Sequence, residues 1–280
     1  MDTTWRPEDL HVNGLTLRAY TLGDGQPLLL LHGVMANART WGRAANALAE
    51  RRRVIAVDQR GHGDSDKPEQ GYAEEDFVAD LTALLRGFER PDLVGHSMGG
   101  RIAALVAAAH PQLVRTLVLA EAVGGPPRPR PEAETLQMRR GAVDWLERMR
   151  AQPRETLRGQ LSNQHPGWTA AELEAFIDGQ LEFAPQMFGP GGMDYFWDWR
   201  TVLPRLTCPT LVLGGDPSTR TFPPAGSDQA SLDEAASLLK AGRVERIAGA
   251  GHMLHLDQPE RFVQIVDAFL SAERDSYGMK

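Results

Sequence analysis

The stretch Leu93-Val94-Gly95-His96-Ser97-Met98-Gly99-Gly100 decides the fold of this chain. It ends a short apolar run with the pattern Gly-x-Ser-x-Gly, and the alanine-rich residues 101–109 that follow favour a helix. A strand that turns sharply into a helix pushes the Ser97 hydroxyl clear of the backbone, and Gly95 and Gly99 leave room for the turn. The free N–H groups at the start of the helix suit a developing oxyanion. We therefore predict that Ser97 is a nucleophile.

The base is predicted to be His252. A nucleophilic serine requires a base that takes its proton and an acid that orients the base, and after this kind of turn the acid and then the histidine follow along the chain. His252 ends the glycine-rich run 249–252, between the strand 244–247 and the last helix. This loop position allows the imidazole to reach the edge of the sheet at which Ser97 stands.

Two carboxylates are candidates for the acid. Asp216 is favoured because it follows the apolar strand 210–213 and a glycine turn. Glu121 is the alternative, because it ends the apolar strand 117–120. Parallel strands end at one edge of a sheet, so either carboxylate is placed to reach His252.

An oxyanion hole is expected from two backbone N–H groups, those of Met98 and Val34. Met98 is the residue after the nucleophile, and Val34 follows the continuous apolar run 27–31, which is typical of a buried parallel strand. We expect His32 and Gly33 to shape the turn after this strand.

These motifs together resemble the α/β-hydrolase fold family over essentially the whole length of the chain. The matching segments, in order, are His32-Gly33, Asp58-Gln59-Arg60-Gly61-His62-Gly63-Asp64-Ser65, Gly95-His96-Ser97-Met98-Gly99-Gly100 and Gly249-Ala250-Gly251-His252. The resemblance implies a serine nucleophile, in place of the aspartate of dehalogenases and epoxide hydrolases with this fold. Asp216 stands one position earlier than family members often have it, and some relatives take their acid from the strand that Glu121 ends. The acid therefore stays open between the two.

Strand–helix alternation predicts an α/β protein with a mostly parallel, eight-stranded sheet and helices on both faces. The expected strands are 10–12, 15–21, 28–31, 53–57, 92–95, 115–120, 209–213 and 243–247, and the expected core helices are 40–50, 75–88, 98–109, 228–241 and 259–271. The proline-rich linker at 124–131 interrupts the alternation, and residues 132–200 favour helices only. We predict a core of residues 1–123 and 201–280, with an all-helical lid at 124–200 after the sixth strand.

Aromatic residues gather in the expected lid and indicate a mainly apolar substrate pocket. Most of them are expected to pack the lid against the sheet, but the cluster 195–199 is too dense for one helix face. The residues predicted to line the pocket are Met35, Trp168, Tyr195 and Trp197. We therefore expect a small-molecule, mainly apolar ester or lactone as substrate.

Charge and composition limit the partners. The net charge of −7 offers no basic patch for nucleic acid or an anionic membrane. The single Cys208 forms no internal disulfide, and no apolar run has the length of a signal peptide or membrane span, so we expect a cytoplasmic protein. No metal and no cofactor are expected. The oligomeric state is left open, with a homodimer among the alternatives.

The predicted function is a serine hydrolase that cleaves a carboxylic ester or lactone through an acyl-enzyme, using Ser97, His252 and an acid. One alternative uses the same residues to hydrolyse a carbon–carbon bond of a vinylogous diketone. Another, of a different class, is a ligand-binding receptor that has kept the fold without turnover.

Overall fold

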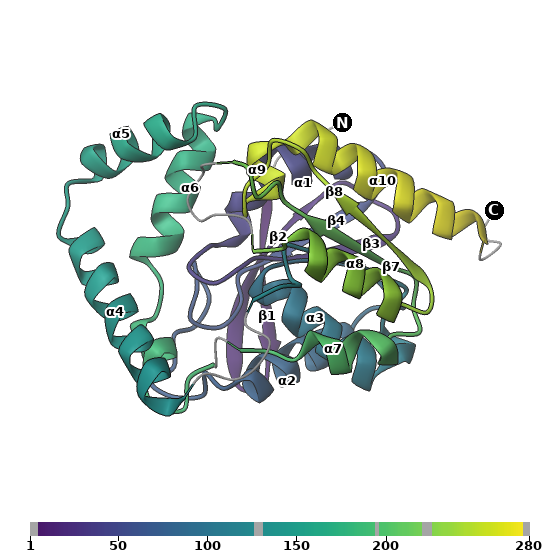
Figure 1. Ribbon diagram of the computed structural model, residues 1–280, viewed down its shortest axis with the longest axis horizontal. Coiled ribbons are helices and arrows are strands. Elements are labelled where there is room, and N and C mark those ends of the chain that lie inside the picture. The colour runs from purple at the N-terminus through teal and green to yellow at the C-terminus, as the bar shows by residue number, and fades with distance from the viewer. Residues whose placement is uncertain (1–4, 126–130, 194–195, 220–225, 277–280) are drawn as a thin grey trace.

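Eight strands form one sheet in the computed structural model, which describes residues 5–125, 131–193, 196–219 and 226–276 (Figure 1). The strands are β1 (Arg6–Val12), β2 (Leu15–Leu22), β3 (Pro27–Leu31), β4 (Arg53–Val57), β5 (Asp92–His96), β6 (Thr116–Ala120), β7 (Thr210–Gly214) and β8 (Gly242–Arg246). Their order across the sheet is β1-β2-β4-β3-β5-β6-β7-β8. The pairs β1–β2 and β2–β4 are antiparallel and the others are parallel, which confirms the predicted mostly parallel sheet.

Helices cover both faces of the sheet, as predicted (Figure 1). The α-helices are α1 (Gly42–Leu48), α2 (Glu74–Leu85), α3 (Met98–Ala109), α4 (Glu132–Arg150), α5 (Arg154–Gln164), α6 (Ala170–Leu181), α7 (Trp199–Val202), α8 (Gln229–Leu238), α9 (Leu254–Asp257) and α10 (Pro259–Ser276). Short 3₁₀ helices are η1 (Ala38–Trp41), η2 (Pro111–Leu113), η3 (Pro185–Phe188) and η4 (Leu203–Arg205). None of the described helices is both long enough and apolar enough to cross a membrane.

The apolar strands are buried on both faces because each face has its own hydrophobic core. In β3, Leu29 and Leu31 pack into the core that includes α2, α3 and α8. Leu28 and Leu30 point the other way, into the core formed with α1, α9 and α10. Successive side chains of a strand alternate between faces, so a strand covered on both sides needs an unbroken apolar run.

Between β6 and β7 the described residues contain helices and no strand. Figure 1 shows α4, α5 and α6 at one side of the molecule, next to the sheet and its covering helices. This agrees with the helical content expected for residues 132–200. Residues 126–130 of the expected linker lie outside the described residues.

The turn from β5 into α3 is packed so closely that glycine is required at two positions. A Cβ atom at Gly95 would lie 2.5 Å from the backbone nitrogen of Gly100, and one at Gly99 would lie 2.3 Å from the carbonyl oxygen of Leu31 in β3. Backbone atoms cannot rotate away as the end of a side chain can. The first turn of α3 therefore lies directly against β3.

We expect Gly99→Ala to lower the free energy of unfolding by about 1–3 kcal/mol, because the methyl group forces α3 away from Leu31. Gly141→Ala is the matched control. Gly141 is an exposed residue of α4 with no atom within 4 Å of an added Cβ, so this change should stabilise the protein by up to about 1 kcal/mol. Urea unfolding of both variants measures the difference. Equal stability of Gly99→Ala and wild type would contradict the close packing.

Candidate active site

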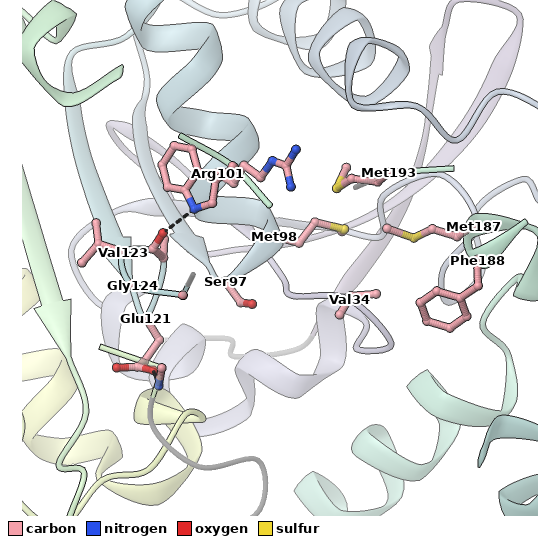
Figure 2. A pocket seen from close by; sticks show the side chains of 14 residues that line it. Val34, Ser97, Met98, Arg101, Glu121, Val123, Gly124, Met187, Phe188 and Met193 are labelled. Carbon is pink, nitrogen blue, oxygen red and sulfur yellow. Dashed lines mark hydrogen bonds between the residues drawn. The ribbon is translucent and has the colours of Figure 1, made fainter. Parts of the chain in front are cut away.

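Ser97 occupies a strained backbone position between β5 and α3. Its φ of 50° and ψ of −115° lie in a region that non-glycine residues rarely adopt. Two hydrogen bonds hold it there: its N–H donates to the Ala120 carbonyl at 2.9 Å, and its carbonyl accepts from the Arg101 N–H at 3.0 Å. The predicted sharp turn is therefore present, and Ser97 lines a cavity at the carboxyl end of the sheet (Figure 2).

The two amides predicted for an oxyanion hole flank Ser97. Met98 is the first residue of α3, and Val34 follows β3 in a turn. The intervening Gly33 brings that turn against the serine, because a Cβ at Gly33 would lie 3.2 Å from the Ser97 Cβ. Both Val34 and Met98 line the cavity with Ser97. No described acceptor receives a hydrogen bond from either amide.

His252 is paired with Glu121. Its Nδ1 lies 3.0 Å from Glu121 Oε2, and the Glu121 side chain is fully buried. A neutral imidazole that donates from Nδ1 to a carboxylate keeps Nε2 as an acceptor. This is the protonation state that a base acting on Ser97 requires.

Two further donors hold the Glu121 carboxylate. The Gly215 N–H donates to Oε1 at 2.6 Å, and the Gly226 N–H donates to Oε2 at 2.5 Å. Burial alone raises the pKa of Glu121, but the hydrogen bonds from His252 and the two amides outweigh it, so the pKa lies below the ordinary value of 4.5. Glu121 also has a positive φ of 50°, a backbone conformation outside the extended region of the strand β6.

The contact between His252 and Glu121 corrects the prediction that Asp216 is the partner of His252. The Asp216 carboxylate accepts from the N–H and hydroxyl of Ser218, at 2.9 and 2.6 Å, and from the Gly249 N–H at 3.1 Å. These bonds lower the pKa of Asp216 to about 2. Asp216 connects two loops, whereas the alternative, Glu121, contacts the imidazole.

The depressed pKa of Glu121 predicts how stability depends on pH. A carboxylate whose pKa is lower in the folded than in the unfolded state stabilises the fold above the unfolded-state value, and this contribution is lost as pH falls through the folded-state value. Wild type should therefore be more stable than Glu121→Gln at pH 7, and the difference should shrink below about pH 4.5. Urea unfolding at a series of pH values measures it. A difference that grew with acidity would show that the Glu121 carboxylate is not stabilised by its donors.

The cavity beside Ser97 has a volume of about 220 Å³ and mainly apolar walls (Figure 2). Its lining residues are Val34, Ser97, Met98, Arg101, Glu121, Ala122, Val123, Gly124, Gly125, Met187, Phe188, Met193, Trp197 and Gly226. Figure 2 shows Met187 and Phe188 across the cavity from Ser97 and Glu121. Three of the lining residues are methionines, Met98, Met187 and Met193, whose flexible side chains adapt to the shape of a ligand.

Of the four predicted pocket residues, the lining includes Trp197. Its indole N–H donates to the Ala122 carbonyl at 3.0 Å. Trp168 is buried in a separate apolar cluster and Met35 packs against the core, so neither lines this cavity, which corrects the prediction for both. Tyr195 lies outside the described residues.

Sequence reasoning missed Met187, Phe188 and Met193 as cavity residues, and it did not place Arg101 among the residues predicted to line the pocket. Arg101 stands one helical turn after Ser97, and this spacing places both side chains on the same side of α3. The Arg101 side chain is largely buried, and its Nε donates to the Glu74 carboxylate of α2. The other three residues lie far along the chain, and their approach depends on how the inserted segment folds back.

Comparison with known proteins assigns the class. Residues 28–265 match the model of the alpha/beta hydrolase family. The chain is 31% identical over 282 residues to the sn-1-specific diacylglycerol lipase ABHD11 of Mus musculus, an alignment that covers 90% of this chain and 85% of that protein. This protein belongs to the alpha/beta hydrolase family.

Particular relatives include hydrolases of several kinds. A 2-(acetamidomethylene)succinate hydrolase of Mesorhizobium japonicum is 41% identical over 109 residues, which cover 38% of this chain and 39% of that protein. The solved structure of an N-formylmaleamic acid deformylase of Pseudomonas putida has a TM-score of 0.73 and 26% identity, and covers 93% of this chain and 100% of that chain. An esterase of Rhodococcus has a TM-score of 0.71 and 28% identity, and covers 95% of this chain and 98% of that chain.

Proposed function

We propose that this protein is a serine hydrolase that cleaves a carboxylic ester or lactone. The observation that carries the proposal is the hydrogen bond between His252 Nδ1 and the buried Glu121 carboxylate, beside the cavity that Ser97 lines. This arrangement supports a nucleophile and an acid that line one small-molecule site, with the base hydrogen-bonded to the acid. Glu121 takes the role of the acid.

In the proposed reaction, His252 Nε2 takes the hydroxyl proton of Ser97 as its oxygen attacks the carbonyl carbon. The N–H groups of Met98 and Val34 stabilise the oxyanion, and Glu121 stabilises the imidazolium. His252 then gives the proton to the departing alkoxide oxygen, which leaves an acyl group on Ser97. A water molecule, deprotonated by His252, attacks the acyl carbon, and His252 returns this proton to the Ser97 oxygen as the bond to the acyl group breaks and the carboxylic acid leaves.

The cavity supports a small, mainly apolar acyl or alcohol group. Its volume of about 220 Å³ is below the roughly 300–1,000 Å³ of pockets that hold drug-sized ligands. Its apolar wall includes Trp197 and three methionines from two separate parts of the chain. The segment that supplies Met187, Met193 and Trp197 serves as the lid in this proposal.

Arg101 favours a second substrate class for the same reaction, an ester or amide that bears a carboxylate. Guanidinium groups bind carboxylates through paired N–H donors, and Arg101 lines the cavity. The succinate hydrolase and the maleamic acid deformylase similar to this chain are named for acids. The Glu74 carboxylate already balances the charge of Arg101, so neutral esters remain the first choice.

Labelling with a fluorophosphonate and a substrate series test the proposed function. The series holds short neutral esters, lactones, carboxylate-bearing esters and a vinylogous diketone. We expect covalent labelling of wild type, turnover of at least one ester or lactone, and a loss of kcat on the order of 10⁶ in Ser97→Ala. A Ser97→Ala variant that kept a tenth of the wild-type kcat would contradict the assignment of Ser97 as the nucleophile. Turnover of the diketone alone would support the alternative that the protein hydrolyses a carbon–carbon bond. Absence of both labelling and turnover would favour the alternative that it is a ligand-binding receptor.

Replacing each candidate carboxylate by its amide tests which of the two residues is the acid that acts with His252. Glu121→Gln removes the charge beside His252 and should lower kcat by up to about 10⁴. Asp216→Asn keeps an oxygen acceptor for the Gly249 N–H and should cost less than about tenfold. Steady-state kinetics on the best ester of the series measures both. A large loss in Asp216→Asn with near-normal Glu121→Gln would reverse the assignment.

A further inference from the structure

The backbone just before His252 is held on two sides. The Asp216 carboxylate accepts from the Gly249 N–H at 3.1 Å, and the Asp216 N–H donates to the Ala250 carbonyl at 2.6 Å. Next along the chain, the Gly251 N–H donates to Asp257 Oδ2 at 2.8 Å. Three successive residues are thus tied by two aspartates from different elements.

The His252 backbone itself is bonded to the end of β5. His96 Nε2 donates to the His252 carbonyl at 2.8 Å. Burial holds the pKa of His96 well below its ordinary value, so this donor stays neutral. The peptide unit of His252 is therefore fixed to the residue that precedes the nucleophile.

Asp257 also contacts the helical segment between β6 and β7. Its Oδ1 accepts from the Trp168 indole N–H at 2.8 Å and lies 3.4 Å from His165 Nδ1. Trp168 and His165 stack with ring centroids 3.9 Å apart, between α5 and α6. The two carboxylate oxygens of Asp257 thus join the inserted segment to the amide next to His252.

Apolar contacts reinforce the same connection on the other side of His252. Met253 and Leu256 are buried in one cluster with side chains of α5 and α6 and the turn between them, namely Leu157, Leu161, Trp168, Leu173, Phe176 and Ile177. The segment that follows His252 therefore packs on the inserted helices, while the amide before it is bonded to them through Asp257.

We propose that Asp257 is a positioning residue for His252, and that α5 and α6 set the place of the imidazole through it. The inference rests on the proposed role of His252 as base. Neither Asp257 nor Trp168 lines the cavity, so their effect reaches the reaction through the histidine loop and not through contact with substrate. The inserted segment then has two tasks: it forms the cavity wall and it holds the base.

Asp257→Asn and Trp168→Phe test the proposal. The asparagine substitution replaces one acceptor oxygen by an NH₂ group that faces an N–H donor, and the phenylalanine substitution removes the indole donor but keeps a stacked ring. We expect kcat to fall about 10- to 100-fold in Asp257→Asn and several-fold in Trp168→Phe, with KM within twofold of wild type. Asp178→Asn is the matched control, because Asp178 of α6 pairs with Arg39 and Arg154 without contact to the histidine loop.

A readout that needs no substrate separates failure of this inference from failure of the proposed function. The proton shared by His252 Nδ1 and Glu121 gives a downfield ¹H NMR signal, identified by its loss in His252→Ala. It should shift or broaden in Asp257→Asn and Trp168→Phe and stay unchanged in Asp178→Asn. Circular dichroism checks folding, and Trp168→Phe carries the test if Asp257→Asn unfolds. Wild-type NMR signals and kcat in both variants, or equal losses in Asp178→Asn, would overturn the inference.

Discussion

The Glu121 carboxylate is the contact on which the arrangement of this site depends. It is fully buried, and it accepts hydrogen bonds from Gly215 after β7, from Gly226 before α8 and from His252 after β8. Three segments that lie far from Glu121 in the sequence are thereby joined at the end of β6. A buried carboxylate without such donors is costly, so these segments and the charge stabilise one another.

Most of the fold is predictable because its pattern is local. Unbroken apolar runs, such as Leu28–Leu31, identify buried strands, and helical stretches between them require parallel crossovers. The turn at Ser97 is predictable for the same reason, since Gly95 and Gly99 stand within two residues of the serine. Its backbone φ of 50° agrees with that local pattern.

The acid and the pocket depend on contacts that no local pattern records. Glu121 directly follows β6 and Asp216 stands two residues after β7, at the same edge of the sheet, so the choice between them lies in the contacts of each side chain. Glu121 is hydrogen-bonded to His252, while Ser218 and Gly249 donate to Asp216. The aromatic residues of the inserted segment divide in the same way: Trp197 reaches the cavity, and Trp168 bonds to Asp257.

The position of the helical insertion has a consequence for the order in which the chain is synthesised. β6 and β7 are neighbours in the sheet, but the ribosome releases all of α4, α5 and α6 between them. Until β7 arrives, β6 has an open edge, and exposed strand edges are where nascent chains associate wrongly. Helices form from local contacts and fold quickly, so the inserted segment is able to gain structure while β6 waits for its partner.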